Sequence, residues 1–371
     1  MGIWRCLKAL SKNREVSKMH IFESNKYRSE IDAVSSMLLP WERLKDCRFL
    51  ITGACGMIGS YMVDALMSAN VRYNLNLQIL AMGRRPEQAQ SRFASYWNDG
   101  DHFQFVCGDV NATIPPQEGM VDYIFHAASN THPVAYATDP IGTICTNIIG
   151  TNNLLQFAVE HHCKRFIFAS TVEIYGENRG DCEYFDETYS GYIDCNTLRA
   201  GYPESKRAGE ALCQAYKKQK NLDVVIPRLP RVYGPTLLTS DTKALSQFMR
   251  KAVDGEDIVL KSDGSQFYSY LHVADAVSGV LHCLFYGENG EAYNISSSKS
   301  DITLRELATK VAELAGRKVV FELPDQTEQA GFSKATKAVM ASSKLQAIGW
   351  SAAVPMDDGL KSCYLHLCGR R

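Results

Sequence analysis

A glycine-rich turn between an apolar strand and a helix is the feature that most constrains this fold. The turn reads GACGMIG at residues 53–59 and directly follows the short apolar segment 48–51. Gly53 permits a tight turn, Gly56 lets the backbone approach a pyrophosphate, and Gly59 lets the helix pack on the strand. Such a turn predicts a phosphate site at the end of a parallel strand.

The helix after this turn strengthens that interpretation. Met57 and Ile58 belong to the turn that leads into it, and the first N–H groups of a helix have no partner within it. The same end carries the positive pole of the helix dipole, which favours phosphate. The sequence therefore predicts dinucleotide binding at residues 53–59.

Apolar strands alternate with helices along the chain, which implies parallel βαβ units. Strands are expected at 48–51, 77–82, 103–107, 121–126, 165–169 and 224–226. Helices are expected at 30–39, 61–67, 147–161, 202–218, 304–315 and 342–348. We predict an α/β fold, a Rossmann-like doubly wound parallel sheet with a smaller C-terminal α/β substrate lobe. The expected domains are an extension with a lead-in helix (1–45), a nucleotide-binding domain carrying the catalytic residues (46–228), and a substrate lobe interleaved with the last core strands (229–371).

Composition excludes some partners. The net charge of −1 gives no global attraction to nucleic acid, and no apolar run approaches the ~20 residues of a membrane span. Residues 1–18 are expected to be a frayed extension rather than a short membrane-touching helix. The twelve cysteines form no C-x-x-C pair, so we expect free thiols, no metal site and a reducing cytoplasm.

A tyrosine and a lysine four residues apart carry the first chemical signal. Tyr202 and Lys206 share one helical face, and an ammonium beside a phenol favours the phenolate. Tyr202 is therefore a candidate general base. The segment STVEIYG at 170–176 precedes this pair and follows the glycine turn.

These three motifs, in this order, resemble the extended short-chain dehydrogenase/reductases of the NAD-dependent epimerase/dehydratase family. This family contains UDP-glucuronate decarboxylases and sugar-nucleotide 4,6-dehydratases, and the resemblance covers about residues 46–360. It implies a nucleotide-diphosphate sugar as substrate, oxidised at C4 to a transient 4-keto intermediate. It also implies a homodimer.

The resemblance assigns roles to four residues. Thr171 is expected to hydrogen-bond the reacting sugar hydroxyl, Tyr202 to remove its proton, and Lys206 to hold the cofactor ribose and lower the pKa of Tyr202. Glu173 matches the glutamate of the family's lyases and could shuttle the C5 proton. Val172 stands where dehydratases carry an aspartate, which counts against dehydration, since valine cannot protonate a leaving hydroxyl.

The cofactor residues follow the second predicted strand. Arg84 and Arg85 stand where an acidic residue would bind the ribose of NAD, and arginine suits the 2′-phosphate of NADP, so NADP is favoured over NAD. The resemblance places Asp109 and Val110 at the adenine. It places Ala127 and Ala128 in the loop that lines the cofactor.

The substrate residues depart from the family pattern. Tyr268 stands where the family carries an arginine that grips the substrate, which weakens the interpretation as a decarboxylase. Arg228 and Arg231 could supply the missing cation, and a structural salt bridge is the alternative for each. An epimerase, a decarboxylase-like lyase, a net 4-ketoreductase and a non-catalytic nucleotide-binding protein therefore stay open.

Overall fold

The computed structural model describes residues 21 and 24–369, apart from 132, 239 and 323–334. The predicted extension at 1–18 lies outside these residues. The large sheet is parallel throughout, in the order β11-β7-β5-β4-β1-β2-β3, with β6 also paired to β7. Its strands are β1 (Arg48–Thr52), β2 (Gln78–Gly83), β3 (Phe103–Cys107), β4 (Tyr123–His126), β5 (Arg165–Phe168), β6 (Ser170–Thr171), β7 (Val224–Leu229) and β11 (Ala292–Asn294).

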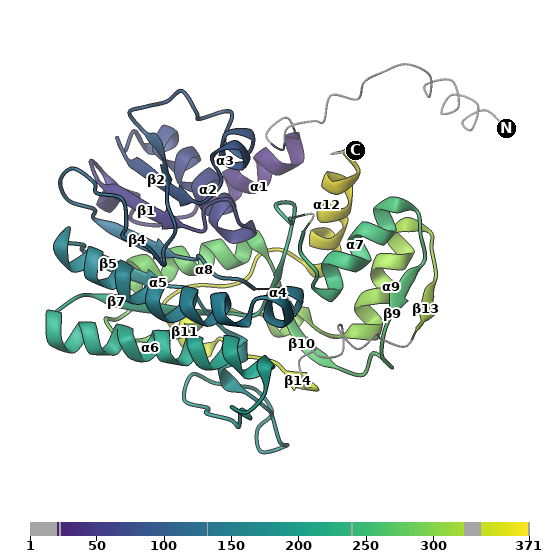
Figure 1. The fold of residues 1–371 in the computed structure, drawn as a ribbon. Coiled ribbons are helices and arrows are strands. Elements are labelled where there is room, and N and C mark those ends of the chain that lie inside the picture. Colours follow the sequence, from purple (N-terminus) through teal and green to yellow (C-terminus); the bar gives the residue numbers. More distant parts are fainter. Residues whose placement is uncertain (1–20, 22–23, 132, 239, 323–334, 370–371) are drawn as a thin grey trace, which may run out of the picture.

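Helices cover both faces of this sheet, as Figure 1 shows. One face carries α1 (Asn25–Ser35), α2 (Met57–Tyr73) and α8 (Val273–Tyr286), and the other carries α5 (Pro140–Glu160) and α6 (Gly201–Lys220). Two short helices, α3 (Pro86–Arg92) and α4 (Pro133–Thr138), follow β2 and β4. The predicted doubly wound fold is therefore confirmed.

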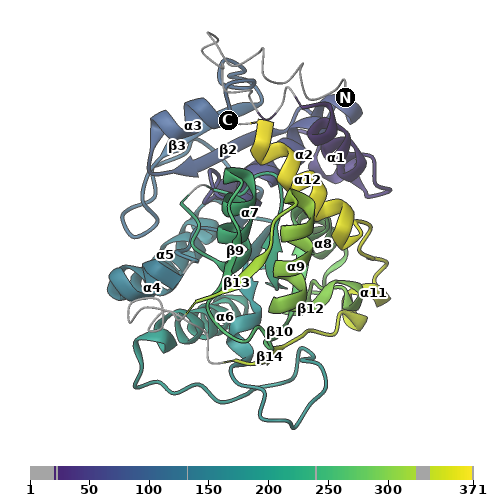
Figure 2. The ribbon, with the colours of Figure 1, turned by 90° about the vertical axis from the view of Figure 1, so that its right-hand side faces the viewer.

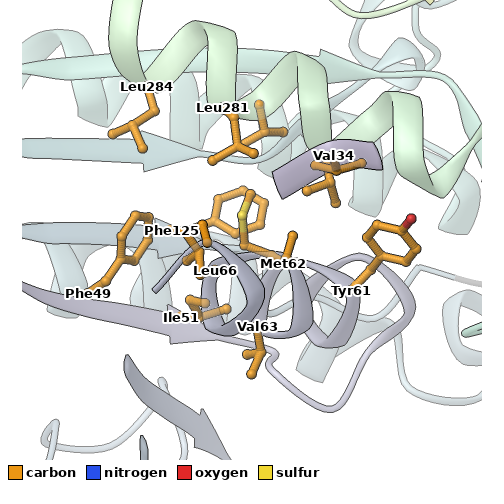
Figure 3. Close-up of a cluster of buried hydrophobic side chains, with 14 of the residues drawn as sticks. Val34, Phe49, Ile51, Tyr61, Met62, Val63, Leu66, Phe125, Leu281 and Leu284 are labelled. Carbon is orange, nitrogen blue, oxygen red and sulfur yellow. The ribbon is translucent and has the colours of Figure 1, made fainter. Parts of the chain in front are cut away.

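The pleat of β1 explains how both faces are packed. Phe49 and Ile51 lie in the core beneath α1, α2 and α8, together with Phe125 and Leu281 (Figure 3). Leu50 lies in the separate core beneath α5 and α6. Because side chains alternate across a strand, one continuous apolar run supplies both cores, as expected for a buried parallel strand.

The second lobe contains the remaining strands. The strand β10 (Phe267–His272) pairs with β8 (Arg231–Tyr233), β12 (Asp301–Thr303) and β14 (Lys337–Ala338), and β9 (Ile258–Leu260) pairs with β13 (Val319–Phe321). Figure 2 shows the helices α7 (Ala244–Asp254), α9 (Leu304–Ala315) and α12 (Met356–Gly369) gathered beside β9 and β13, with α11 (Ser343–Ala347) further along.

Several helix boundaries differ from the expected ones. The helix predicted at 61–67 is α2, which runs from Met57 to Tyr73. The helix predicted at 30–39 is α1 and begins at Asn25, where the Ser24 side chain caps it by accepting from the Tyr27 N–H at 3.4 Å. The helix predicted from 147 begins at Pro140, after the N-cap Asp139. The starts of α1 and α5 carry a capping residue, and proline is favoured in the first turn.

Among the described residues, no helix is both long and apolar enough to cross a membrane.

Candidate active site

A cavity of about 600 Å³ lies between the carboxyl ends of the large sheet and the second lobe. The strand order reverses between β1 and β4, and ligands of doubly wound sheets bind outside the strand ends at such a point. All but one of the predicted site residues line this cavity. They are Gly53, Gly56, Met57, Ile58, Gly59, Arg84, Arg85, Asp109, Val110, Ala127, Ala128, Thr171, Glu173, Tyr202, Lys206, Arg231 and Tyr268.

The glycine turn forms one end of the cavity and leaves no room for side chains. Gly53 has φ +67°, and a Cβ there would lie 2.8 Å from the Ala127 carbonyl oxygen. A Cβ on Gly59 would lie 2.4 Å from the Gly53 oxygen, so glycine is needed for close helix–strand packing. No side chain caps α2 at Gly56, so its first N–H groups remain available to phosphate. These residues fit a dinucleotide cofactor.

The predicted adenosine end holds a weak ion pair. Arg84 Nη1 lies 3.8 Å from the Asp109 carboxylate, and both side chains are largely solvent-accessible. An exposed pair of this kind contributes about 0–1 kcal/mol, so Arg84 can turn toward a ligand at little cost. Arg85 lines the cavity beside it.

The catalytic candidates Thr171 and Tyr202 meet at the centre of the cavity. Thr171 ends β6, and Tyr202 lies in the first turn of α6. Burial raises the pKa of Tyr202 to about 12, although a hydrogen bond with Thr171 opposes this rise. Deprotonation of Tyr202 therefore needs positive charge nearby.

Lys206 is buried on the same helix but is directed elsewhere in this state. Its Nζ donates to the Ala169 carbonyl at 2.9 Å and lies 4.7 Å from the centre of the Phe168 ring. Burial lowers the pKa of Lys206 to about 8. The predicted influence of Lys206 on Tyr202 stays a prediction.

A charged cluster occupies the other end of the cavity. Glu173 accepts from Arg199 Nη2 at 2.7 Å and lies 3.7 Å from Arg231 Nη2. Burial alone would raise the pKa of Glu173, but the two arginines outweigh it and lower this pKa below its ordinary value. Glu173 is thus an ionised partner of two guanidinium groups, which makes it a poor proton donor.

Arg231 packs against Tyr268, the residue that departs from the family pattern. Its guanidinium carbon lies 3.5 Å from the centre of the Tyr268 ring, a cation–π contact. The two residues come from the paired strands β8 and β10. A cation therefore lies beside the position where the family carries its arginine.

Arg228 is the predicted site residue that does not line the cavity. Its guanidinium forms two hydrogen bonds to Glu210, at 3.0 and 2.7 Å, and a third to the Tyr175 hydroxyl at 2.9 Å. It also donates to the Glu187 carbonyl. Its contacts are those of a structural ion pair behind the site.

Two cavity residues that contact predicted site residues were not themselves predicted. Arg199, from the short turn Leu198–Ala200 before α6, pairs with Glu173, and Tyr136 from α4 stacks on Tyr202. The position of Arg199, three residues before Tyr202, was a signal that could have indicated it, because this spacing shares a helical face. No local signal identified Tyr136.

The fold and the lining of this cavity are those of a dinucleotide-dependent enzyme. The chain belongs to the NAD dependent epimerase/dehydratase family, which it matches over residues 49–296. The prediction of an NAD(P)-dependent enzyme of the nucleotide-sugar epimerase/dehydratase type is thereby confirmed, since its relatives and structural neighbours are nucleotide-sugar decarboxylases, dehydratases and epimerases.

Relatives and solved structures agree with this assignment. The chain is 30% identical to UDP-glucuronic acid decarboxylase 6 of Arabidopsis thaliana over 317 residues, 84% of this chain and 86% of that protein. A double mutant of the dTDP-glucose 4,6-dehydratase DesIV from Streptomyces venezuelae, solved with NAD bound, is 25% identical with a TM-score of 0.74, covering 86% and 96% of the two chains. UDP-glucuronic acid 4-epimerase from Bacillus cereus, at 21% identity and a TM-score of 0.72 over 86% and 98%, shares the fold.

Proposed function

We propose that this enzyme oxidises C4 of a nucleotide-diphosphate sugar whose C6 is a carboxylate, and that carbon dioxide is then lost. The observation that carries this proposal is the excess of positive charge at the sugar end of the cavity. Arg199 and Arg231 face a single carboxylate, Glu173. Arg199 Nε and Nη1 and Arg231 Nη1 are buried without a hydrogen-bond partner among the described residues. Buried unpaired donors of this kind favour an anionic ligand.

The first step uses the centre of the cavity. Tyr202 accepts the proton of the C4 hydroxyl, while the Thr171 hydroxyl hydrogen-bonds the same oxygen. A bound oxidised nicotinamide cofactor would supply the hydride acceptor and a positive charge beside Tyr202. Lys206 would exchange its bond to Ala169 for the cofactor ribose.

The second step follows from the chemistry of the product. A ketone at C4 makes the sugar a β-keto acid, so the C5–C6 electrons pass to the ketone oxygen as carbon dioxide leaves. C5 of the resulting enolate would then take up a proton, and C4 would regain the hydride from the bound cofactor, so that substrate and product differ by carbon dioxide alone. Arg231, lying on Tyr268, supports this reaction because it offers a cation beside the position where the family's arginine is missing. Val172 is buried and cannot act as an acid at C6, which disfavours dehydration.

The test is to incubate the purified enzyme with UDP-glucuronic acid and NAD or NADP and to record the product by mass spectrometry and NMR. A product lighter by carbon dioxide is expected, with Tyr202→Phe reducing turnover by about 10³-fold or more. Unchanged substrate with both cofactors, under conditions where the enzyme binds a cofactor, would contradict the proposal.

Epimerisation at C4 is a second candidate, favoured by the same arginine pair. Two guanidinium groups stabilise a localised carboxylate, whereas loss of carbon dioxide disperses its charge. Tight binding of the carboxylate by both arginines would thus oppose the loss of C6 as carbon dioxide. A product of unchanged mass with inverted C4 would identify this reaction.

The cofactor proposal is a preference for NADP. Arg84 and Arg85 line the cavity after β2, and Arg84 is held only by its exposed pair with Asp109. Arginine side chains at this position suit a 2′-phosphate.

A homodimer is proposed through α5 and its neighbourhood. Ile141, Ile144 and Ile149 are exposed along one side of α5, and Leu198 is exposed in the turn before α6. An apolar stripe on the outer helices favours a partner surface. Sedimentation of the wild type against Ile141→Glu would test the dimer.

The described cysteines are all free thiols, which supports a reducing compartment such as the cytoplasm.

A further inference from the structure

A column of one cation and two aromatic rings stands at the catalytic tyrosine. The Tyr136 ring stacks on the Tyr202 ring, with centroids 4.9 Å apart and planes inclined by 26°. The Arg199 guanidinium carbon lies 4.7 Å from the Tyr136 centroid. All three side chains line the cavity, and they come from three different elements, α4, the 198–200 turn and α6.

The column is fixed at the end away from Tyr202. Arg199 Nη2 donates to Glu173 at 2.7 Å, and its side chain is mostly buried. Tyr136 itself is buried, with 7% of its surface exposed. A buried guanidinium on an aromatic face interacts more strongly than an exposed one, so the arrangement holds the Tyr202 ring plane and brings a charge toward it.

Lys206, by contrast, hydrogen-bonds the Ala169 carbonyl and not Tyr202. The pKa of Tyr202 is raised first by burial, lowered by the hydrogen bond with Thr171, raised by the Glu173 charge and lowered by the Arg199 charge. The groups that act on Tyr202 are Thr171, Glu173, Arg199 and the stacked Tyr136. The charge of Asp241 also acts on Tyr136.

We propose that Arg199 and Tyr136 are positioning residues for Tyr202. Arg199 is a cation, additional to Lys206, that favours the phenolate form of Tyr202, and Tyr136 is the ring that lies between Arg199 and Tyr202 and contacts both. Because this role presupposes Tyr202 as the base, it rests on the proposed function. It adds a feature that the tyrosine–lysine pair does not contain, a cation presented through a stacked ring.

The experiment is a pH titration of protein labelled with [¹³C]tyrosine, in the presence of NADP or NAD, from pH 6 to 11. The Tyr202 resonance is identified by its absence in Tyr202→Phe. Arg199→Gln is expected to raise its midpoint by about one pH unit, Tyr136→Leu to raise it by a smaller amount, and Arg199→Lys to restore most of the shift.

A matched control exists on the surface. Arg179 lies 4.1 Å from the centre of the Tyr192 ring, a cation–π contact outside the column. Arg179→Gln should leave the Tyr202 midpoint unchanged. Circular dichroism of each variant separates loss of folding from loss of coupling.

Two results would overturn the inference. One is a Tyr202 midpoint unchanged in Arg199→Gln and in Tyr136→Leu while both remain folded. The other is a wild-type Tyr202 that does not titrate in this range with cofactor bound. Because the titration needs no turnover, absence of activity on UDP-glucuronic acid would contradict the proposed function and leave this measurement intact.

Discussion

The two ends of the cavity are built in different ways. The phosphate end consists of backbone from one contiguous segment, 53–59, where added side chains would collide with carbonyl groups. The opposite end consists of side chains from four separate places, the charged Glu173, Arg199 and Arg231 and the ring of Tyr268. The glycine turn is determined by steric contacts within a short stretch of chain. The charged cluster is determined by ion pairs between residues that are distant in the sequence.

Separate replacement of two arginines that are three residues apart tests whether charge pairing builds this end of the cavity, and it has the largest expected effect. Arg231→Gln should lower kcat/KM for UDP-glucuronic acid by about 10²-fold, because the enzyme loses a charged donor that would hydrogen-bond the substrate carboxylate. The free energy of unfolding should change little. Steady-state kinetics and urea unfolding measure both quantities.

Arg228→Gln is the matched control. It removes the cation paired with the mostly buried Glu210, which keeps only its hydrogen bond from Ser170 among the described residues, so we expect a loss of about 3 kcal/mol in the free energy of unfolding. Its effect on KM should be smaller than that of Arg231→Gln. Equal kinetic losses with unchanged stability in both variants would show that our distinction between the two arginines is wrong.

At the phosphate end, Gly53→Ala tests the steric requirement. Its positive φ and the 2.8 Å approach to Ala127 predict a loss of about 2 kcal/mol in stability and weaker cofactor binding. Gly100→Ala is the control, because a Cβ there meets nothing within 4 Å. Calorimetry with each cofactor compares the two, and wild-type cofactor affinity in Gly53→Ala would refute the tight-turn argument.

The cofactor preference offers a smaller effect at the same end. Arg84→Asp should weaken NADP binding relative to NAD by about 10-fold, because a carboxylate replaces a cation beside the 2′-phosphate. The ratio of the two dissociation constants is the measurement. A wild type that prefers NAD would show the assignment of Arg84 and Arg85 to be mistaken.

Lys206 gives the smallest expected change in stability, and this change depends on pH. Its pKa falls from an ordinary 10.5 to about 8 on folding, so the unfolded chain binds more protons between these values and wild-type stability rises with pH there. Lys206→Met should abolish turnover yet raise the free energy of unfolding by about 1–2 kcal/mol at pH 7. Urea unfolding at pH 7 and pH 10 should show this gain shrinking at the higher pH.

Much of the fold could be predicted because its signals are local. The strands β1 to β5 and β7 are short apolar runs, and α9 has clear periodicity and begins with a capping box at Thr303. The helix α8 was missed because nearly every residue in it is buried. A helix buried on all sides shows no amphipathic period.

The site residues also fall into two groups, those that local sequence patterns indicate and those that only the folded structure identifies. The glycine turn and the pair Tyr202 and Lys206 were identified from spacing alone. The different positions of Arg228 and Arg231 were not identified, because both follow the strand predicted at 224–226. The structure places Arg228 in β7, paired with Glu210, and Arg231 in β8, beside Glu173. Tyr136 also required the folded chain, since its contact with Tyr202 joins residues 66 positions apart.

The sequence by itself determined the doubly wound fold, the phosphate turn and the candidate base. These depend on backbone geometry and on neighbours three or four residues away, which the order of residues specifies directly. Only the tertiary structure decided which cations line the cavity and that Arg199 is among them. Charge pairing acts between groups that are distant in the chain, so it depends on which side chains the completed fold brings within about 4 Å.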